Sequence, residues 1–532
     1  MKIHSISISK YKNLSGIIKL DNSLVTLLIG QNGLGKSNLL EVLAKIFTYL
    51  YTRALGWRKF DNFDKPNFDF QIDYECNGNE LRAGSKNGQL GIYILDKERQ
   101  GYKPIIKHEL IDSSQLYLPT QIFIYYSGEN RRIERLEDDF VKEEHKRRRR
   151  NISHGGEVTE PRHILTINNS HSLLILLTLL FYRQNPNYSI DINNVLEEVL
   201  NIRIKNVLGL TLHSPRFAKI SELKKQEELL QNYYRRMIEG EISVENIRFW
   251  RINGKIETFL RYVFQYAQQL SSPVEMTVNK RLSKEYVNFS SIDVTKDFCK
   301  GLYNLFPTPI EFFNLLYEMN KLDMIDNINF SISKSEASNE TFSFGQLSEG
   351  EQQYLTVMGL ITLNKIINTE ALFLLDEPDT HINPLWQRSY IDNIEKTVGI
   401  ESKDKVQFFI STHSPFLVQS YDKNVVSMLL FRHDYKGNIV IDNGNYSLKN
   451  WRIDQVMMSQ YFEFPNARPI STDKFMEARD KIIAKGILND EDRKELENII
   501  KAEGNLPTGE TINDIEAMAY INSEVKKLKE KQ

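Results

Sequence analysis

The residue pattern with the clearest chemistry is residues 30–37, GQNGLGKS, which matches the phosphate-binding pattern GxxxxGK(S/T). Glycines let the backbone curl so that successive N–H groups point at phosphate oxygens. Lys36 adds a positive charge, and the Ser37 hydroxyl is a ligand for Mg²⁺. A buried strand is expected at residues 24–29, just before the loop; the structural alternative is a glycine-rich turn before a helix. We predict a site for ATP and Mg²⁺ with these nucleotide-binding residues: Asn32, Gly33, Gly35, Lys36, Ser37 and Asn38.

Two adjacent carboxylates follow a second apolar run. Residues 371–375, ALFLL, are typical of a buried strand, and they lead directly into Asp376 and Glu377. An acid at the carboxyl edge of a parallel sheet, beside a phosphate loop, can hold Mg²⁺, and we assign that role to Asp376. Glu377 is placed to orient and deprotonate the attacking water. An acidic cap before a loop is the structural alternative, which the phosphate loop upstream disfavours.

Two further patterns lie in the second half of the chain. Residues 347–353, LSEGEQQ, stand at a predicted helix start, where Ser348 and Glu351 form a capping box. The same serine hydroxyl, the Gly350 N–H and the helix N-terminus also make an anion site. His413 follows another apolar run, residues 406–410, although a lone histidine is more often structural.

In this order, the four patterns resemble those of the ABC-type ATPases. The resemblance implies that His413 takes the switch-histidine position, where its imidazole hydrogen-bonds the γ-phosphate and acts with Glu377 in catalysis. It also implies that Ser348 and Gly350 of one subunit complete the nucleotide site of another. The expected assembly is therefore a head-to-tail homodimer around two ATP molecules, or a higher oligomer built from it.

The same resemblance assigns a linking role to residues 379–384, DTHINP, which match the loop between the two nucleotide sites. Relatives often carry Glu and His where this chain has Asp379 and Asn383, so the position of the loop is clearer than its contacts. Gln121 is a candidate for the glutamine of the Q-loop.

Strands and helices alternate on both sides of a long helical stretch, which predicts an α/β fold: an ABC-type P-loop ATPase head split by a helical insertion. We predict an N-terminal lobe, a helical insertion, a C-terminal lobe with the signature, the Asp-Glu pair and the histidine, and a small helical C-terminal region. The N-terminal lobe is expected at residues 1–165 and the helical insertion at 166–327. The C-terminal lobe is expected at 328–455 and the helical C-terminal region at 456–532.

The long gap between the phosphate loop and the LSEGEQQ pattern resembles the split ATPase domains of the SMC, RecF and OLD group. The helices are too short and irregular for an SMC arm, and no Toprim-like acidic set follows His413. The compact insertion, residues 451–455 (WRIDQ) and the charged tail with LPTGET resemble the PtuA-type ATPases of Septu and retron antiphage systems. This resemblance implies an ATPase that senses DNA or other nucleic acid and controls an HNH-type nuclease, without being a nuclease itself. The alternative is a RecF- or SMC-like DNA-repair clamp without a nuclease partner.

Composition sets the remaining expectations. The formal charge is −2, so nucleic-acid contact requires a local basic patch, and two cysteines exclude a disulfide framework. No apolar run approaches the ~20 residues that span a bilayer, which predicts a soluble, cytoplasmic protein without membrane contact. A basic cluster, Arg131, Arg132, Arg135 and residues 146–150, either follows phosphates or is a solvated charged segment.

Overall fold

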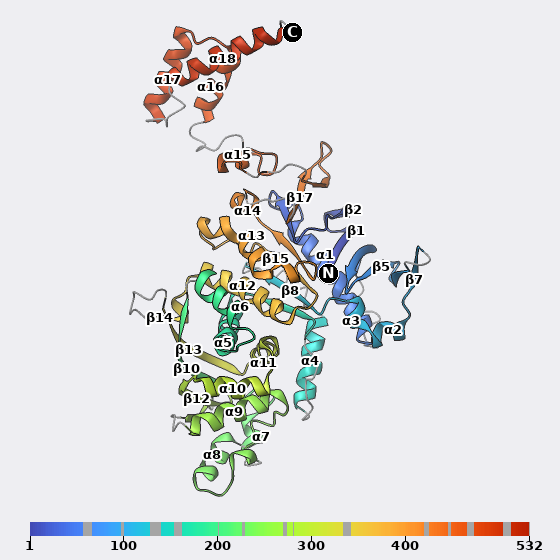
Figure 1. The fold of residues 1–532 in the computed structure, drawn as a ribbon, viewed down its shortest axis with the longest axis vertical. Coiled ribbons are helices and arrows are strands. Elements are labelled where there is room, and N and C mark those ends of the chain that lie inside the picture. Colours follow the sequence, from blue (N-terminus) through green and yellow to red (C-terminus); the bar gives the residue numbers. More distant parts are fainter. Residues whose placement is uncertain are drawn as a thin grey trace. The chain divides into compact units, whose positions relative to one another are not determined.

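The structure is a computed structural model (Figure 1). It divides by internal contacts into two units, Met1–Lys449 and Asn450–Gln532. It describes residues 1–56, 66–96, 100–127, 140–153, 162–199, 202–225, 229–269, 274–279, 281–333, 342–419, 425–444, 448, 450–464, 473–503 and 512–530. Arg131, Arg132 and Arg135 of the predicted basic cluster, and the LPTGET segment, lie outside these residues.

A seven-stranded sheet forms the centre of the first unit, in the order β18-β17-β3-β16-β15-β8-β9. All neighbouring pairs are parallel except β17 with β18. Every residue of β15 and β16 is buried, as expected for strands covered on both faces. The strands predicted from apolar runs are therefore confirmed. The bounds are β3 Val25–Gly30, β8 Gln121–Tyr126, β9 Ile164–Ile167, β15 Ala371–Asp376, β16 Val406–Ser411, β17 Val426–His433 and β18 Ile439–Asn443.

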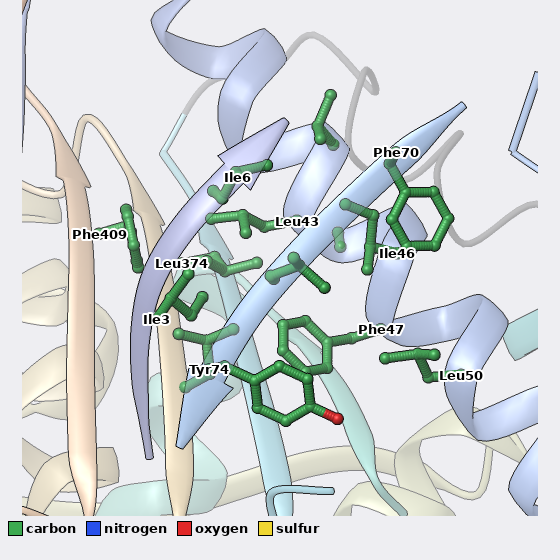
Figure 2. Close-up of a cluster of buried hydrophobic side chains, with 14 of the residues drawn as sticks. Ile3, Ile6, Leu43, Ile46, Phe47, Leu50, Phe70, Tyr74, Leu374 and Phe409 are labelled. Atoms are coloured by element: carbon green, nitrogen blue, oxygen red, sulfur yellow. The ribbon is translucent and has the colours of Figure 1, made fainter. Parts of the chain in front are cut away.

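A second, antiparallel sheet has the order β2-β1-β4-β5-β6-β7. Helix α1 (Lys36–Ala54) packs its apolar side chains, among them Phe47, into one core with residues of both sheets (Figure 2). Each Leu, Ile or Phe buried in this way contributes ~1.5–3 kcal/mol to folding. The core thus fixes the helix that follows the phosphate loop. The strand bounds are β1 Lys2–Tyr11, β2 Leu14–Lys19, β4 Phe70–Cys76, β5 Asn79–Lys86, β6 Gln89–Asp96 and β7 Gly101–Pro104.

The region predicted as a helical insertion, residues 166–327, contains helices but also strands that the sequence analysis did not predict. Three strands within it join β13 and β14 in a sheet of order β11-β12-β10-β13-β14. Helix α5 packs against α11 and against α12 (Figure 1). The bounds are α5 Ser172–Tyr182, β10 Arg203–His213, α8 Leu230–Ile238, α9 Lys255–Gln269, β11 Val274–Asn279, β12 Lys284–Asp293, α10 Lys296–Leu305, α11 Pro309–Lys321, β13 Ile325–Ser333, β14 Phe342–Ser343 and α12 Glu349–Ile367.

The second unit, Asn450–Gln532, is helical in its described residues. Three of its helices share a small core of Ala478, Ile482, Leu496 and Ile515. The boundary between the two units, after Lys449, falls near residue 456, where this region was predicted to start. The exact bounds of the four predicted regions are not tested by this division. Across the described residues, no helix combines the length and apolarity needed to cross a bilayer. The helices are α15 Ile453–Met457, α16 Asp473–Lys485, α17 Asp490–Glu503 and α18 Ile512–Glu530.

Candidate nucleotide site

The phosphate loop connects the end of β3 to the start of α1. Gly33 and Gly35 adopt φ angles of 83° and 105°, in the left-handed region where a side chain would strain the backbone. Lys36 Nζ folds back over the loop and donates hydrogen bonds to the carbonyl oxygens of Gly30 (2.7 Å) and Gln31 (3.1 Å). Burial lowers the pKa of Lys36 to about 8, although the nearby carboxylates favour its charged form. The loop therefore has the predicted form, with its ammonium group held beside the backbone.

Asp376 lies beside this loop because β15 and β3 both run parallel to β16 and end at the same edge of the sheet. Ser37 Oγ donates to Asp376 Oδ1 at 3.0 Å, and Ser411 Oγ donates to the same oxygen. Burial raises the pKa of Asp376, while these two hydrogen bonds oppose the shift. A hydroxyl next to a carboxylate is a donor set that suits Mg²⁺, so the residues fit the predicted metal.

Glu377 and His413 stand at the same edge, one residue beyond β15 and two beyond β16. The Glu377 N–H donates to the carbonyl and the hydroxyl oxygen of Ser411, both at 3.1 Å, which holds Glu377 at a φ of 50°. His413 Nε2 lies 3.6 Å from Glu377 Oε1, and both side chains are about two-fifths exposed. Burial lowers the pKa of His413, and the positive charge of Lys36 lowers it further, whereas the negative charge of Glu377 raises it. The imidazole is therefore neutral near pH 7.

These groups line one cavity of about 750 Å³. Of the predicted site residues it brings together all but Ser348 and Gly350: Asn32, Gly33, Gly35, Lys36, Ser37, Asn38, Asp376, Glu377 and His413. Five further lining residues were not predicted from the sequence: Tyr11, Lys12, Glu41, Lys45 and Tyr126. Tyr11 Oη donates to Glu41 Oε2 at 2.8 Å, which ties the end of β1 to α1. Glu41 and Lys45 follow the loop by one and two turns of α1, so helical periodicity was a signal for both.

Ser348 and Gly350 lie at the N-terminus of α12, apart from this cavity. The predicted capping box is confirmed: Glu351 N–H donates to Ser348 Oγ, and Glu351 Oε2 accepts from the Ser348 N–H at 2.8 Å. Gly350 is buried, and a Cβ there would lie 2.2 Å from the carbonyl oxygen of His381. This close approach explains the glycine.

Gln353, one turn into α12, connects this helix to the loop after β15. Its Nε2 donates to the Glu377 carbonyl oxygen at 3.0 Å, and its Oε1 accepts from the His381 N–H at 3.3 Å. The side chain is fully buried. Gln353 belongs to the LSEGEQQ pattern, but the pattern did not predict these contacts, which only the fold shows.

The loop of residues 379–384 is anchored by side chains at both ends. Asp379 is buried, and its Oδ2 accepts from Thr412 Oγ1 at 2.8 Å. Burial raises the pKa of Asp379 to about 7, although the Thr412 hydrogen bond opposes the shift. Asn383 caps α13 (Pro384–Val398) by accepting from the Trp386 N–H at 3.0 Å. Asp379 and Asn383, the two residues that differ from the common pattern, therefore each accept a hydrogen bond that holds this loop.

Gln121, the candidate for the Q-loop glutamine, does not lie at the nucleotide cavity. Gln121 is the first residue of β8 and pairs with Ala371, whereas Tyr126 at the other end pairs with Asp376. Because the two strands are parallel, Gln121 lies at the edge of the sheet away from the nucleotide cavity. The residue type suggested the role, but the strand direction excludes it.

A phosphate loop, a carboxylate pair and a histidine at one edge of a mostly parallel sheet, with an antiparallel sheet alongside, define the head of an α/β P-loop ATPase. The AAA ATPase domain family matches residues 1–418, and the chain belongs to this family.

The chain is similar to the Retron Ec83 probable ATPase of Escherichia coli. The two are 24% identical over 459 residues, which cover 81% of this chain and 71% of that protein. It is also similar to the Septu protein PtuA of Bacillus thuringiensis, with 29% identity over 94 residues, or 18% of this chain and 22% of PtuA. These relatives confirm the resemblance to retron and Septu ATPases. Among solved structures, the SMC head domain from Thermotoga maritima aligns over 84% of this chain and 100% of its own, with 12% identity and a TM-score of 0.31.

Proposed function

We propose that the chain binds ATP in the 750 Å³ cavity and hydrolyses it to ADP and phosphate. The observation that carries this proposal is the convergence of Lys36, Ser37, Asp376, Glu377 and His413 on one cavity from separate parts of the sequence. When bound, Mg²⁺ supplies positive charge to the phosphate oxygens, and Ser37 and Asp376 hold it. Lys36 exchanges its two carbonyl partners for β- and γ-phosphate oxygens.

Glu377 and His413 have different roles in the proposed reaction. The exposed Glu377 carboxylate orients the attacking water and accepts its proton. The neutral imidazole of His413 has one N–H to donate to a γ-phosphate oxygen. Its distance of 3.6 Å from Glu377 leaves both groups at the same face of the cavity.

The test compares three variants of the purified protein. Glu377→Gln should keep ATP binding and lose ~10²–10⁴-fold in turnover, because only the general base is removed. Lys36→Ala should weaken ATP binding itself, and Glu401→Gln, an exposed glutamate outside the cavity, is the matched control with parental activity. Steady-state hydrolysis by Glu377→Gln equal to that of the parent would refute the assignment.

We further propose that two copies assemble head to tail. The absence of Ser348 and Gly350 from the cavity lining of a single chain supports a site that a second subunit completes. In that case Ser348→Arg should block hydrolysis while allowing each subunit to bind ATP. Mixing Ser348→Arg with Lys36→Ala should restore about one active site per heterodimer, since one pairing of intact halves remains. Two folded variants that stay inactive when mixed argue against the arrangement.

The similarity to a retron ATPase and to PtuA supports a role in antiphage defence. We propose that the chain senses nucleic acid and controls a partner nuclease of HNH type, using Mg²⁺ and ATP but cutting nothing itself. Purified chain with ATP and Mg²⁺ or Mn²⁺ should leave single- and double-stranded DNA and tRNA intact. ATP-regulated cleavage should appear only when an HNH-type nuclease from a neighbouring gene is added. Cleavage by the chain alone that persists in Lys36→Ala would overturn this proposal.

A further inference from the structure

A second cavity, of about 290 Å³, lies at the opposite edge of the seven-stranded sheet from the nucleotide site. This volume is just below the usual range for ligand pockets, ~300 Å³ and above. The wall is formed by the start of β8, by α4 (Phe140–Ser153), α9 and α11, and by the end of α12. The cavity therefore lies where the ATPase core meets the inserted region.

Two amide side chains in this wall have unmet hydrogen-bonding capacity. Within the described part of the chain, Gln121 Oε1 and Asn314 Oδ1 are buried and have no hydrogen-bond partner. Gln121 is 2% exposed, and its Nε2 donates to the Arg162 carbonyl oxygen at 3.5 Å. Buried amide oxygens in folded proteins are almost always paired, because leaving one unpaired is unfavourable. Both residues therefore have spare capacity to accept an N–H donor beside the cavity.

The charged groups of the wall are already ion-paired. Arg162 donates to Glu318 through Nε at 2.6 Å and through Nη2 at 3.2 Å. Arg148 lies 3.4 Å from the same carboxylate, and at the mouth Lys255 lies 4.0 Å from Glu311. Paired charges give little attraction for an ion of either sign, so a neutral ligand fits best.

The rest of the wall combines four polar residues, Thr120, Asn253, Thr308 and Thr369, with an apolar part that suits flat faces. Its apolar part is aliphatic: Ile152, Ile256, Ile310, Leu315 and Ile367. Small-molecule sites combine such walls with a few polar groups that fix orientation.

We propose that this cavity binds a nucleobase. Its amino and ring N–H groups would donate to Gln121 and Asn314, while its faces pack on the aliphatic walls. Proteins read unstacked bases in this way, through hydrogen bonds to one edge and apolar contacts to the faces. A free nucleoside and an unstacked base of a single strand present the same edge.

The position of the cavity connects it to the nucleotide site. Strands β8 and β15 run from Gln121 and Ala371 at the cavity end to Tyr126 and Asp376 at the other. Helix α12 likewise begins at its cap Ser348 and ends at Ile367 in the cavity wall. An occupant therefore contacts β8 and α12, whose far ends carry Tyr126 of the nucleotide cavity and Ser348 of the proposed dimer site.

The proposal is tested by calorimetric titration of the full-length protein with the individual nucleosides and with short single-stranded homopolymers. At least one nucleoside should bind with a Kd of ~0.1 mM, as expected for a ligand of this size. Tighter binding of the matching homopolymer identifies a strand as the source, and binding of the nucleoside alone identifies the free compound. Because nucleosides lack phosphates, Lys36→Ala should leave their affinity unchanged.

Two variants and a matched control locate the binding. Gln121→Leu and Asn314→Leu should each weaken nucleoside binding by ~3- to 10-fold. Gln184→Leu is the control, because Gln184 also has an unpartnered buried Oε1 in the described chain but does not line the cavity. Without ligand, Gln121→Leu should melt at or above the parental temperature, which separates lost binding from lost folding. No binding of any nucleoside or strand, or affinity unchanged in both cavity variants, overturns the proposal.

Discussion

Replacing Asp379 with Asn should change how the stability of the protein depends on pH. The side chain is 4% exposed, and in the described structure only its Oδ2 has a hydrogen-bond partner, the Thr412 hydroxyl. Burial raises the pKa from 3.8 to about 7, against the effect of that hydrogen bond. The folded protein therefore binds more protons than the unfolded chain between about pH 4 and 7, and the free energy of unfolding falls as pH rises through this window. The difference in pKa corresponds to ~4 kcal/mol in the free energy of unfolding. The parent has lost this stabilisation in full above pH 7, relative to its value at low pH.

An Asn side chain has nearly the shape of the protonated acid and does not titrate. Thermal and urea unfolding of Asp379→Asn should match the parent below about pH 4 and show higher stability, by up to ~4 kcal/mol, near pH 8. Asp434→Asn is a control of opposite sign, since hydrogen bonds from Asn438 lower the pKa of that exposed carboxylate. It should give no gain in stability near pH 8. Equal pH slopes for the parent and Asp379→Asn would refute the reasoning.

Three shorter predictions concern α12 and α4. Gln353→Leu removes both hydrogen bonds that hold the loop after β15, so turnover should fall ~10-fold or more while ATP affinity is retained; equal turnover contradicts this. Gly350→Ala places a Cβ 2.2 Å from a carbonyl oxygen, so the start of α12 must shift and ATPase activity should be lost with little loss of ATP binding. Exposed Arg149 and Arg150 should each contribute ~0.9 to the salt slope if they contact DNA phosphates, and an unchanged slope in the double Ser variant identifies a solvated helix face.

The central sheet was predictable because its strands are buried on both faces and form continuous apolar runs. In the inserted region, β11 has no buried residue, and β12 is buried mainly on one face, where Glu285 takes an inward position. That carboxylate accepts hydrogen bonds from Trp250 Nε1 and from the Leu230 and Gln231 N–H groups. A buried charge with partners from distant segments looks like an exposed residue in the sequence.

The nucleotide site was predictable wherever its residues belong to one contiguous pattern. Residues 30–37 carry their own loop geometry, and Asp376 is placed by the end of its strand. Tyr11 and Lys12 reach the cavity because the end of β1 lies beside α1. No local sequence pattern reveals this contact. Gln121 was a candidate for the site because of its side chain alone. The direction of its strand, which places it at the other edge of the sheet, could not be read from the sequence.

The start of α12 links the two proposed halves of the ATPase. In the proposed dimer, Ser348 contacts nucleotide bound to the second subunit. Gln353, little more than one turn further along, donates a hydrogen bond to the carbonyl of Glu377, the proposed general base of its own subunit. Gly350 packs so closely on His381 that the helix and the loop after β15 must move together. Movement of α12 on engaging the partner's ATP would therefore reposition Glu377, so ATP bound at one site should alter the rate of hydrolysis at the other.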